Sequence, residues 1–247
     1  MARRIEGPLA DILSYLEDIG YDSLRRPERA GPKVETHPTA AGAATEAPAG
    51  LARGPSGTSL GELEAEALAC TRCRLAGTRR KVVFGTGDPH ARLMLIGEGP
   101  GGEEDRQGLP FVGPAGELLT KILQAIGLAR SQVYIANIVK CRPPENRDPE
   151  PDEVAACRPY LEGQIAAVRP AVIVALGRVA AQVLLGNETP IGRLRGRWYR
   201  YAEADLMVTY HPAALLRNAD YKRPTWEDMQ KVRDRLAQLA QAENTSR

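Results

Sequence analysis

From about residue 59 onward, apolar and polar residues alternate in a way that divides the chain into strand-like and helix-like segments. Five runs are rich in apolar or β-branched residues and are too short for buried helices, so each predicts a strand. Between them, apolar residues recur every three or four positions, as on one face of a helix. The predicted strands cover residues 93–96, 133–139, 171–176, 198–201 and 206–210.

The predicted helices have identifiable starts and breaks. Ser59 is a favourable N-cap for the first helix, which leads directly to Cys70. Pro159 is expected to kink or interrupt the third helix, because proline has no backbone N–H to donate. The helices are predicted over residues 62–69, 113–127, 152–168, 178–185 and 225–240.

Helices that alternate with strands predict an α/β fold with a largely parallel sheet between two helical layers. In such sheets, ligands bind at loops that follow the carboxyl ends of the strands. The loops that meet this description cover residues 97–105, 140–151 and 211–218. The first of them contains GxGxxG, but four acids between residues 98 and 105 would repel a pyrophosphate. That loop therefore suits a neutral or cationic group better than a dinucleotide.

The first 59 residues follow a different pattern. Residues 1–26 predict one amphipathic helix, and no motif in it indicates a binding partner. Residues 27–59 are rich in Pro, Ala, Gly and Thr, so they cannot bury enough apolar surface to offset the entropy of ordering. We expect an N-terminal helical extension over 1–26, a disordered linker over 27–59 and one folded domain over 60–247.

Composition and charge narrow the class of protein. The chain has 247 residues and 43% apolar content, which is enough for one sizeable α/β domain. It contains neither an apolar run of about 18 residues nor a signal peptide, so we expect a soluble, cytoplasmic protein without a membrane segment. The net charge is only +2, but residues 72–81 hold five cations and no acid, and residues 193–200 hold four arginines. Such groups suit either a solvated face or an anionic polymer.

The four cysteines require a common explanation. Cys70 and Cys73 form a close pair, whereas Cys141 and Cys157 lie far along the chain with 15 residues between them. Cytosolic proteins rarely use cysteines for disulfides, and four separate buried thiols are the simplest alternative. A four-thiolate metal site accounts for all of them together, and both zinc and a cubane iron–sulfur cluster accept four cysteines. Spacing alone favours neither metal.

Six motifs, taken together, resemble the family 4 uracil-DNA glycosylases. The resemblance covers about residues 60–239 and implies a three-layer αβα sandwich around a central, mostly parallel four-stranded sheet. It also implies that the four cysteines hold a [4Fe–4S] cluster, with zinc less favoured. The motifs are CxxC at 70–73, GEGPG at 97–101, PFVG at 110–113, NIVKCRPP at 137–144, Cys157 and YHPAALLR at 210–217.

The resemblance implies a DNA-repair hydrolase. Members of this family hydrolyse the N-glycosidic bond of uracil in DNA, which leaves an abasic site for base excision repair. We therefore expect uracil-containing DNA as the partner and a monomeric protein. An alternative of a different class is a non-catalytic metal-cluster module that binds nucleic acid, for which the cysteines and cations suffice. A zinc base deaminase is excluded, because the His-x-Glu part of its signature is absent.

The resemblance also assigns residues to the base. Phe111 stacks on the uracil ring, and Asn137 reads its pairing edge by accepting from N3–H and donating to O4. Cytosine presents the opposite order of donor and acceptor, so a fixed amide rejects it. Gly99 lines the same pocket, and Glu104 packs near C5, where thymine carries a methyl group. His211 contacts O2, on which negative charge grows as the bond breaks, so Asn137 and His211 are also candidate catalytic residues. Without the resemblance, these would be a core phenylalanine, a turn-capping asparagine and an acid that favours the helix dipole.

The remaining matched residues concern catalysis and DNA contact. Glu98 is the third candidate catalytic residue: it could act as a base, orient a water molecule or stabilise the oxocarbenium-like sugar. Leu215 and Leu216 resemble an apolar wedge that enters DNA, with Arg217 beside them for phosphate contact. We expect one leucine to enter DNA and the other to anchor the loop in the core. Some family members carry a lysine in the helix after the phenylalanine, where an ungapped alignment puts Ala125, so their charge network is not expected here.

Overall fold

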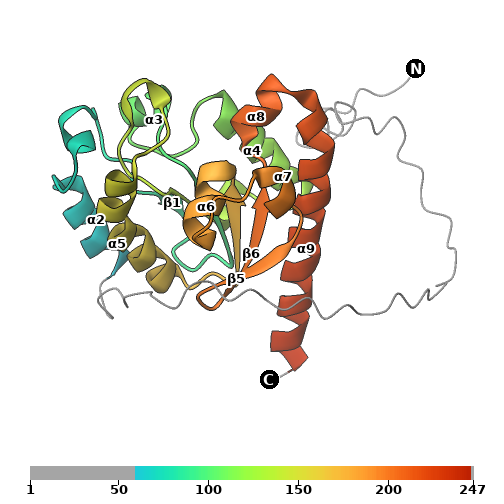
Figure 1. Ribbon diagram of the computed structural model, residues 1–247. Helices are drawn as coiled ribbons and strands as arrows, with labels where there is room; N and C mark the ends of the chain where they lie inside the picture. The colour runs from blue at the N-terminus through green and yellow to red at the C-terminus, as the bar shows by residue number, and fades with distance from the viewer. Residues whose placement is uncertain (1–58, 246–247) are drawn as a thin grey trace, which may run out of the picture.

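The computed structural model describes residues 59–245, and at its centre lies a six-stranded sheet in the order β1-β3-β2-β4-β6-β5 (Figure 1). The helical extension and linker predicted before residue 59 lie outside the described residues. The four inner strands pair in parallel and form the predicted central sheet: β3 (Tyr134–Asn137), β2 (Leu93–Gly97), β4 (Val172–Leu176) and β6 (Ala204–Thr209). Two antiparallel edge strands extend it to six: β1 (Thr86–Gly87) and β5 (Trp198–Tyr201).

Helices cover both faces of this sheet and complete the three layers predicted from the sequence (Figure 1). Because side chains alternate along a strand, β2 sends Met94 and Ile96 to one face and Leu93 and Leu95 to the other. Two apolar cores result, one under each helical layer. One layer consists of α2 (Leu60–Leu68), α5 (Pro151–Val168), α6 (Arg178–Leu185) and α7 (Ile191–Leu194). The other consists of α4 (Pro114–Ala125), α8 (Pro212–Arg217) and α9 (Lys222–Thr245).

Local sequence signals explain where α2 starts but not how α5 continues. Ser59 caps α2 as predicted: its hydroxyl accepts from the N–H of Glu62, and its own N–H donates to the Glu62 carboxylate. The predicted interruption at Pro159 is wrong, because α5 runs through this residue without a break. Ala155 and Pro159 are both exposed, so water can bind the carbonyl that the missing N–H leaves free. No helix within residues 59–245 is long and apolar enough to cross a membrane.

The carboxyl ends of the parallel strands meet at one edge of the sheet, the upper edge in Figure 1. Above that edge stand α3 (Gly102–Gln107), which follows β2, and α8, which follows β6. The pairing register sets Gly97, the last residue of β2, beside Asn137, the last residue of β3. The N–H of Gly177 after β4 donates to the carbonyl of Thr209 at the end of β6. The loops predicted to be functional therefore converge on one place.

Candidate functional site

A cavity of about 560 Å³ opens between these loops. Its size lies within the usual range of small-molecule pockets, about 300–1,000 Å³. The residues predicted to bind the base and to catalyse all line it, although they follow three different strands. They are Glu98, Gly99, Glu104, Phe111, Asn137 and His211, and Arg217 lines the cavity with them.

Asn137 is only 2% exposed at the end of β3. Its Oδ1 atom is buried and has no hydrogen-bond partner within residues 59–245. An unpaired buried acceptor costs about 1–3 kcal/mol, so this atom is suited to a ligand that donates a hydrogen bond. Gly97 allows the side chains of Asn137 and Phe111 to lie close to its backbone, because a Cβ at Gly97 would be 2.4 Å from Oδ1 and 2.8 Å from the Phe111 ring.

Phe111 and His211 form a stacked pair in this cavity. Their ring centroids are 5.4 Å apart, and the ring planes are inclined by 30°. Phe111 is buried and has a left-handed backbone with φ of 52°, which costs a non-glycine residue about 1–3 kcal/mol. A Cβ at Gly116 would lie 1.8 Å from the Phe111 carbonyl oxygen, so α4 can approach the loop only with glycine at that position. The packing of α4 thus holds the ring in place.

Glu104 supports the Phe111 loop from α3. Its Oε1 atom accepts from the N–H of Val112 at 3.0 Å and from the N–H of Gly113 at 3.1 Å. The sequence does not indicate this task, because it depends on how α3 packs beside the loop. The predicted place of Glu104 near C5 of a base stays a prediction.

His211 is the N-cap of α8, and its hydrogen bond fixes which ring nitrogen can donate. Nδ1 accepts from the N–H of Ala213 at 3.1 Å, so a neutral ring carries its proton on Nε2. Burial, reinforced by the positive charge of Arg217, lowers the pKa of His211 to about 4. Near neutral pH the residue is therefore an uncharged donor through Nε2–H.

Glu98 follows β2 and lies near an ion pair that also lines the cavity. The pair joins Asp148, from the loop after β3, to Arg178 at the start of α6. Burial and, to a smaller degree, the negative charge of Asp148 raise the pKa of Glu98 to about 7, while Arg178 opposes the shift. Neither Asp148 nor Arg178 stands out in the sequence. The loop of Asp148 is a predicted functional loop, but no pattern separates this acid from its neighbours.

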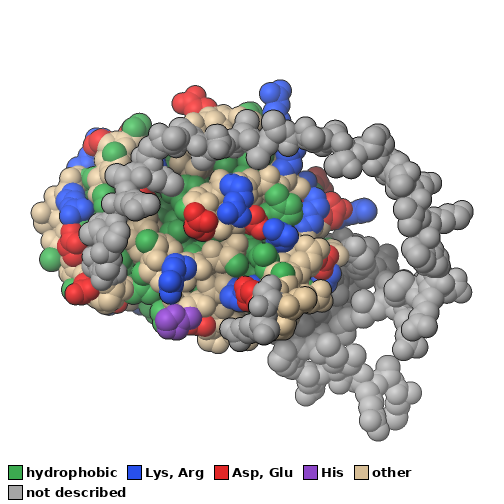
Figure 2. Space-filling view, turned by 90° about the horizontal axis from the view of Figure 1, so that it is seen from below, with side chains coloured by type: hydrophobic (Ala, Val, Ile, Leu, Met, Phe, Trp, Pro, Cys, Tyr) green, Lys and Arg blue, Asp and Glu red, His purple; other side chains and the backbone are tan. Residues whose placement is uncertain are grey.

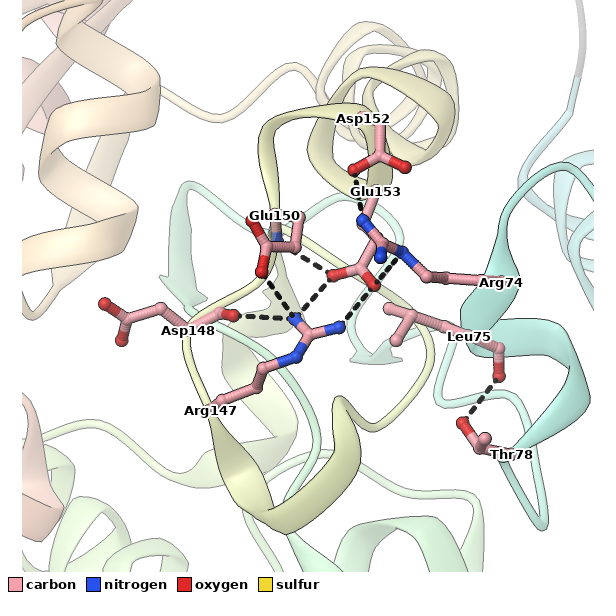
Figure 3. A network of polar contacts seen from close by, with 8 residues as sticks. All are labelled: Arg74, Leu75, Thr78, Arg147, Asp148, Glu150, Asp152 and Glu153. Carbon is pink, nitrogen blue, oxygen red and sulfur yellow. Dashed lines mark hydrogen bonds and ion pairs between the residues drawn. The ribbon is translucent and has the colours of Figure 1, made fainter.

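A buried carboxylate ties the loop of Asp148 to the segment that follows Cys73 (Figure 3). Glu153 in α5 is fully buried, and Arg147 binds its two oxygens at 2.7 and 2.9 Å. Arg74 approaches the same carboxylate (Figure 3), and its Nε atom lies 3.1 Å from Oε1 of Glu153. Glu153 is buried, but the side chains of Arg147 and Arg74 are 34% and 60% exposed, so the contact is one of charge-assisted hydrogen bonds, worth about 1.5–3 kcal/mol each. It ties down the loop of Arg147, which forms one wall of the cavity.

The four cysteines, all of them free thiols, surround a second cavity. Two N–H groups point at the sulfurs: Arg79 donates to Cys141 at 3.4 Å, and the backbone of Lys140 donates to Cys157 at 3.2 Å. Within residues 59–245, no three His, Cys, Asp or Glu side chains converge as they would around a single metal ion. The fold nevertheless brings the four predicted ligands together around one space: Cys70, Cys73, Cys141 and Cys157.

Lys140 connects the cysteine cavity with the cavity that Asn137 lines. Its side chain is 1% exposed, and the ammonium donates to the carbonyl of Asn137 at 2.8 Å and to Gln164 at 2.6 Å. Burial lowers the pKa of Lys140 to about 8, while negative charge on Cys157 and Cys141 acts in the opposite direction. The same side chain therefore fixes the strand end that carries Asn137 and places a cation near the sulfurs.

The two leucines of α8 differ in exposure. Leu215 is 1% exposed and belongs to the core shared with α4 and α9, so its predicted contact with DNA is wrong. Leu216 is 54% exposed, and the side chain of Arg217 beside it has no polar partner within residues 59–245. One anchoring and one exposed leucine were expected, because adjacent residues on a helix point about 100° apart.

Most cations of the basic segment at 72–81 are already engaged. Arg72 and Arg74 pair with acids of α2 and α5, and Arg79 donates to a cysteine. Of this segment, only Arg80 and Lys81 have side chains without a polar partner in the described part of the chain. Figure 2 shows the end of the molecule that lies away from the cavity. There, acidic and basic side chains are interspersed, as on a solvated face.

Ala125 is the last residue of α4 and packs against the core to which α9 also contributes. The first turn of α4, with Ala115, lines the cavity. About ten residues of helix, or roughly 15 Å, separate the two positions. An alanine instead of a lysine at this position therefore takes no charge away from the cavity.

Comparison with known proteins places the described domain among one group of enzymes. The family model described as "Uracil DNA glycosylase superfamily" matches residues 84–230. The chain is 45% identical over 185 residues to a type-4 uracil-DNA glycosylase of Sulfurisphaera tokodaii, which covers 71% of this chain and 84% of that protein. It is 44% identical to a type-4 uracil-DNA glycosylase of Saccharolobus solfataricus, over 68% of this chain and 82% of that protein. It is 42% identical to one of Archaeoglobus fulgidus, over 70% of this chain and 92% of that protein.

Proposed function

The chain belongs to the type-4 uracil-DNA glycosylases of the uracil DNA glycosylase superfamily, and from this membership we propose that it hydrolyses the N-glycosidic bond of uracil in DNA. The products are free uracil and an abasic site, and their formation begins base excision repair. To reach the bond, the enzyme must turn the nucleotide out of the base stack and into its pocket.

The observation that carries this proposal is the unpaired Oδ1 of Asn137 in the cavity that Phe111 lines. Uracil offers N3–H to this acceptor and O4 to the amide N–H. Cytosine has an acceptor at N3, so the two lone pairs would face each other, and such sites reject the wrong base by about 10⁴–10⁵. Stacking on Phe111, worth about 1–3 kcal/mol, offsets part of the cost of flipping the base.

His211 supplies the donor for the leaving group. As the glycosidic bond breaks, the electron pair moves onto uracil and negative charge grows on O2. A neutral histidine whose Nδ1 is already occupied offers Nε2–H to that oxygen. The low pKa of His211 keeps the ring neutral, so the residue acts by hydrogen bonding rather than by proton transfer. Removal of one hydrogen-bond donor to a developing negative charge commonly lowers the rate of reaction by about 10²–10³-fold.

Glu98 acts on the sugar, on the other side of the glycosidic bond from His211. The departure of uracil leaves an oxocarbenium-like sugar, and a water molecule must add to it. An ionised carboxylate can stabilise that positive charge and orient the water, and both tasks require Glu98 to be deprotonated. Because its pKa is raised to about 7, the ionised form becomes dominant only above neutral pH.

We propose that the four cysteines hold a [4Fe–4S] cluster, with zinc the less favoured alternative. Two features support this: the thiols surround a cavity, and N–H groups of Arg79 and Lys140 donate to sulfur. Hydrogen bonds to sulfur are one of the means by which proteins tune iron–sulfur sites. When bound, the cluster would cross-link the CxxC segment, the loop after β3 and α5. Protein purified without oxygen should contain iron and sulfide and absorb near about 400 nm, and stoichiometric zinc would contradict the assignment.

We further propose that Leu216 fills the gap left by the flipped uracil, while Arg217 contacts phosphate. Leu216 is exposed on α8 next to Arg217, which lines the cavity and whose side chain has no polar partner within the described residues. None of the four cysteines forms a disulfide, which is typical of a reducing compartment, and we propose that the enzyme acts in the cytoplasm as a monomer.

The proposed function is tested with a single-stranded oligonucleotide that contains one uracil, followed by alkali, which cleaves DNA at abasic sites. We expect cleavage at the uracil, and intact strands when thymine or cytosine replaces it. Asn137→Ala, purified in the same way, controls for contaminating glycosylases. A protein that binds the strand but leaves no alkali-labile site would instead be a non-catalytic nucleic-acid-binding module.

A further inference from the structure

The proposed function gives no task to Leu109, an exposed leucine close in sequence to Phe111, which lines the cavity. Leu109 is 46% exposed and lies in the loop between α3 and α4, two residues before Phe111. Leu216 on α8 has a similar exposure of 54%. Figure 1 shows α3 and α8 at the same end of the sheet, and residues of both helices line the cavity. The two leucines therefore belong to two different walls of one site.

The backbone on both sides of Leu109 is fixed. Gly108 closes α3 in a left-handed conformation, with φ of 83°, and its N–H donates to the carbonyl of Glu104 at 2.7 Å. On the other side, Arg130 donates to the carbonyl of Pro110. Burial of a leucine side chain is favourable by about 1.5–3 kcal/mol. Because this fixed loop keeps Leu109 in solvent, a binding partner that covers the side chain would gain that free energy.

Free positive charge lies next to Leu109. The carboxylate of Asp105 in α3 accepts from the backbone N–H of Arg80 at 2.9 Å and from that of Lys81 at 3.4 Å, which ties this segment to α3. The Cδ atom of Lys81 lies 3.3 Å from the place of a Cβ on Gly108, directly before Leu109. Neither cation has a polar side-chain partner within residues 59–245. An exposed leucine with a free cation beside it therefore occurs on both walls.

We propose that Leu109 is a second apolar contact to duplex DNA, on the wall opposite Leu216. This inference rests on the proposed function. A flipped uracil leaves a gap, and the base step next to the gap loses stacking worth a few kcal/mol. Leu216 fills the gap, and Leu109 packs against the neighbouring, partly unstacked step. Arg80 and Lys81 bind the phosphates beside that step, to which their charge is complementary.

The test compares single-turnover excision of uracil from a duplex and from a single strand at one salt concentration. For Leu109→Ala we expect a loss of about tenfold on the duplex and of less than about twofold on the single strand, because only the duplex has paired steps to open. Leu109→Met should keep the wild-type rate. Leu109→Gln, which retains the length of the side chain but not its apolar surface, should lose as much as the alanine variant.

Trp198→Ala is the control, because Trp198 is also exposed, at 38%, but lies in the edge strand β5 and lines neither the cavity nor the surface of Arg80 and Lys81. An equal loss in this control would overturn the proposal. So would an unchanged duplex rate for Leu109→Ala, or equal losses on both substrates, which would mean that Leu109 only supports the Phe111 loop. Thermal unfolding at the wild-type temperature confirms that the variants are folded. A wild-type protein that excises uracil from neither substrate would overturn the proposed function itself, so the two failures are distinguishable.

Discussion

The floor and the mouth of the cavity are built in different ways. The floor is buried and held by close packing: glycine backbones, a stacked ring pair and a capping hydrogen bond fix its side chains. The mouth carries exposed side chains from two loops and two helices, some in an ion pair and some without a polar side-chain partner within residues 59–245. The floor consists of Asn137, Phe111 and His211. The mouth consists of Leu109, Asp148, Arg178, Leu216 and Arg217.

We propose that this difference separates two tasks. A buried and preorganised floor acts on the base after it has left the stack, so its residues should matter equally for paired and single-stranded uracil. An exposed and charged mouth acts on the DNA, so its residues should matter most where strands must be opened and where salt competes for phosphate. Substitutions can therefore be sorted by the ratio of the two excision rates.

Asn137→Ala should have the largest effect. We expect uracil excision to fall by about 10³-fold or more on both substrates, because the base loses the group that reads N3–H. Affinity for undamaged DNA should stay within about twofold, since phosphate contacts supply most non-specific binding. Single-turnover kinetics and fluorescence anisotropy measure the two quantities. Asn146→Ala is the control, because Asn146 also lines the cavity but is exposed, and equal losses for both variants would deny Asn137 its role.

His211→Ala should slow both substrates by about 10²–10³, because its hydrogen bond strengthens only as charge develops on O2. The dissociation constant for DNA should change little, which separates this residue from the mouth. His90→Ala, in an exposed turn before β2, is the matched control and should have no effect. If the rate of excision fell much more on the duplex than on the single strand, His211 would act on the DNA, like the residues of the mouth, and not on the flipped base.

Glu153→Gln should destabilise the fold around the loop that contains Arg147 and Asp148, which lines the cavity. We expect the free energy of unfolding to fall by about 2 kcal/mol, because Arg147 and Arg74 lose their charge-assisted hydrogen bonds to the Glu153 carboxylate. Glu162→Gln in the same helix is the control, because Glu162 has only a loose pair with Arg158 at 3.9 Å and should lose less than about 1 kcal/mol. Denaturant titration measures both, and similar losses would mean that the Glu153 contact contributes little to the fold.

Leu216→Ala should reduce excision from a duplex by about tenfold, or about 1.4 kcal/mol, and leave the single-strand rate within about twofold. Salt must be held constant, because weaker phosphate binding alone would also lower the duplex rate. If the excision rates on both substrates fall equally, Leu216 acts by supporting the position of His211 and does not contact the duplex.

Asp148→Asn should have the smallest effect and a distinctive one. Wild-type excision should rise with pH and level off above about pH 7, where Glu98 is ionised. Loss of the negative charge of Asp148 lowers the pKa of Glu98, so the midpoint should move to lower pH. Glu98→Gln should abolish this inflection, and an unchanged midpoint in Asp148→Asn would exclude the interaction.

Glu98 also makes folding depend on pH. Its pKa is about 7 in the folded protein and 4.5 as the ordinary value, so the unfolded chain releases this proton at lower pH. The contribution of Glu98 to stability is therefore fully present below about pH 4.5 and is lost as the pH rises to about 7. Thermal unfolding of Glu98→Gln should lack this component.

Most of the fold could be predicted because it follows from local patterns. The parallel strands lie on near-continuous apolar runs and the helices on amphipathic ones, so burial is visible in contiguous residues. Pro159 is an exception, since the packing of α5 on the sheet overrides the local preference of proline. The residues of the floor could also be predicted, because Asn137, Phe111 and His211 belong to motifs that resemble a known family. Two of them also lie at strand ends, since Asn137 is the last residue of β3 and His211 follows β6.

The residues that the sequence did not indicate depend on partners far along the chain. Lys140 is buried because Gln164 and the Asn137 carbonyl accept from its ammonium, and Glu153 is buried because Arg74 reaches it from another segment. Neither contact leaves a periodic pattern in the sequence. Leu215 and Leu216 are identical neighbours, and only the packing of α8 against the core distinguishes them.

Release of uracil, cytosine and N3-methyluracil from otherwise identical single strands tests most directly whether Asn137 reads N3–H. Single strands remove the cost of unpairing, so differences in rate report the floor alone. We predict rapid release of uracil and rates for cytosine and N3-methyluracil that are lower by more than about 10³-fold, because neither offers a proton to Oδ1. Release of N3-methyluracil at a rate close to that of uracil would contradict this role of Asn137 and, with it, the proposed basis of base recognition.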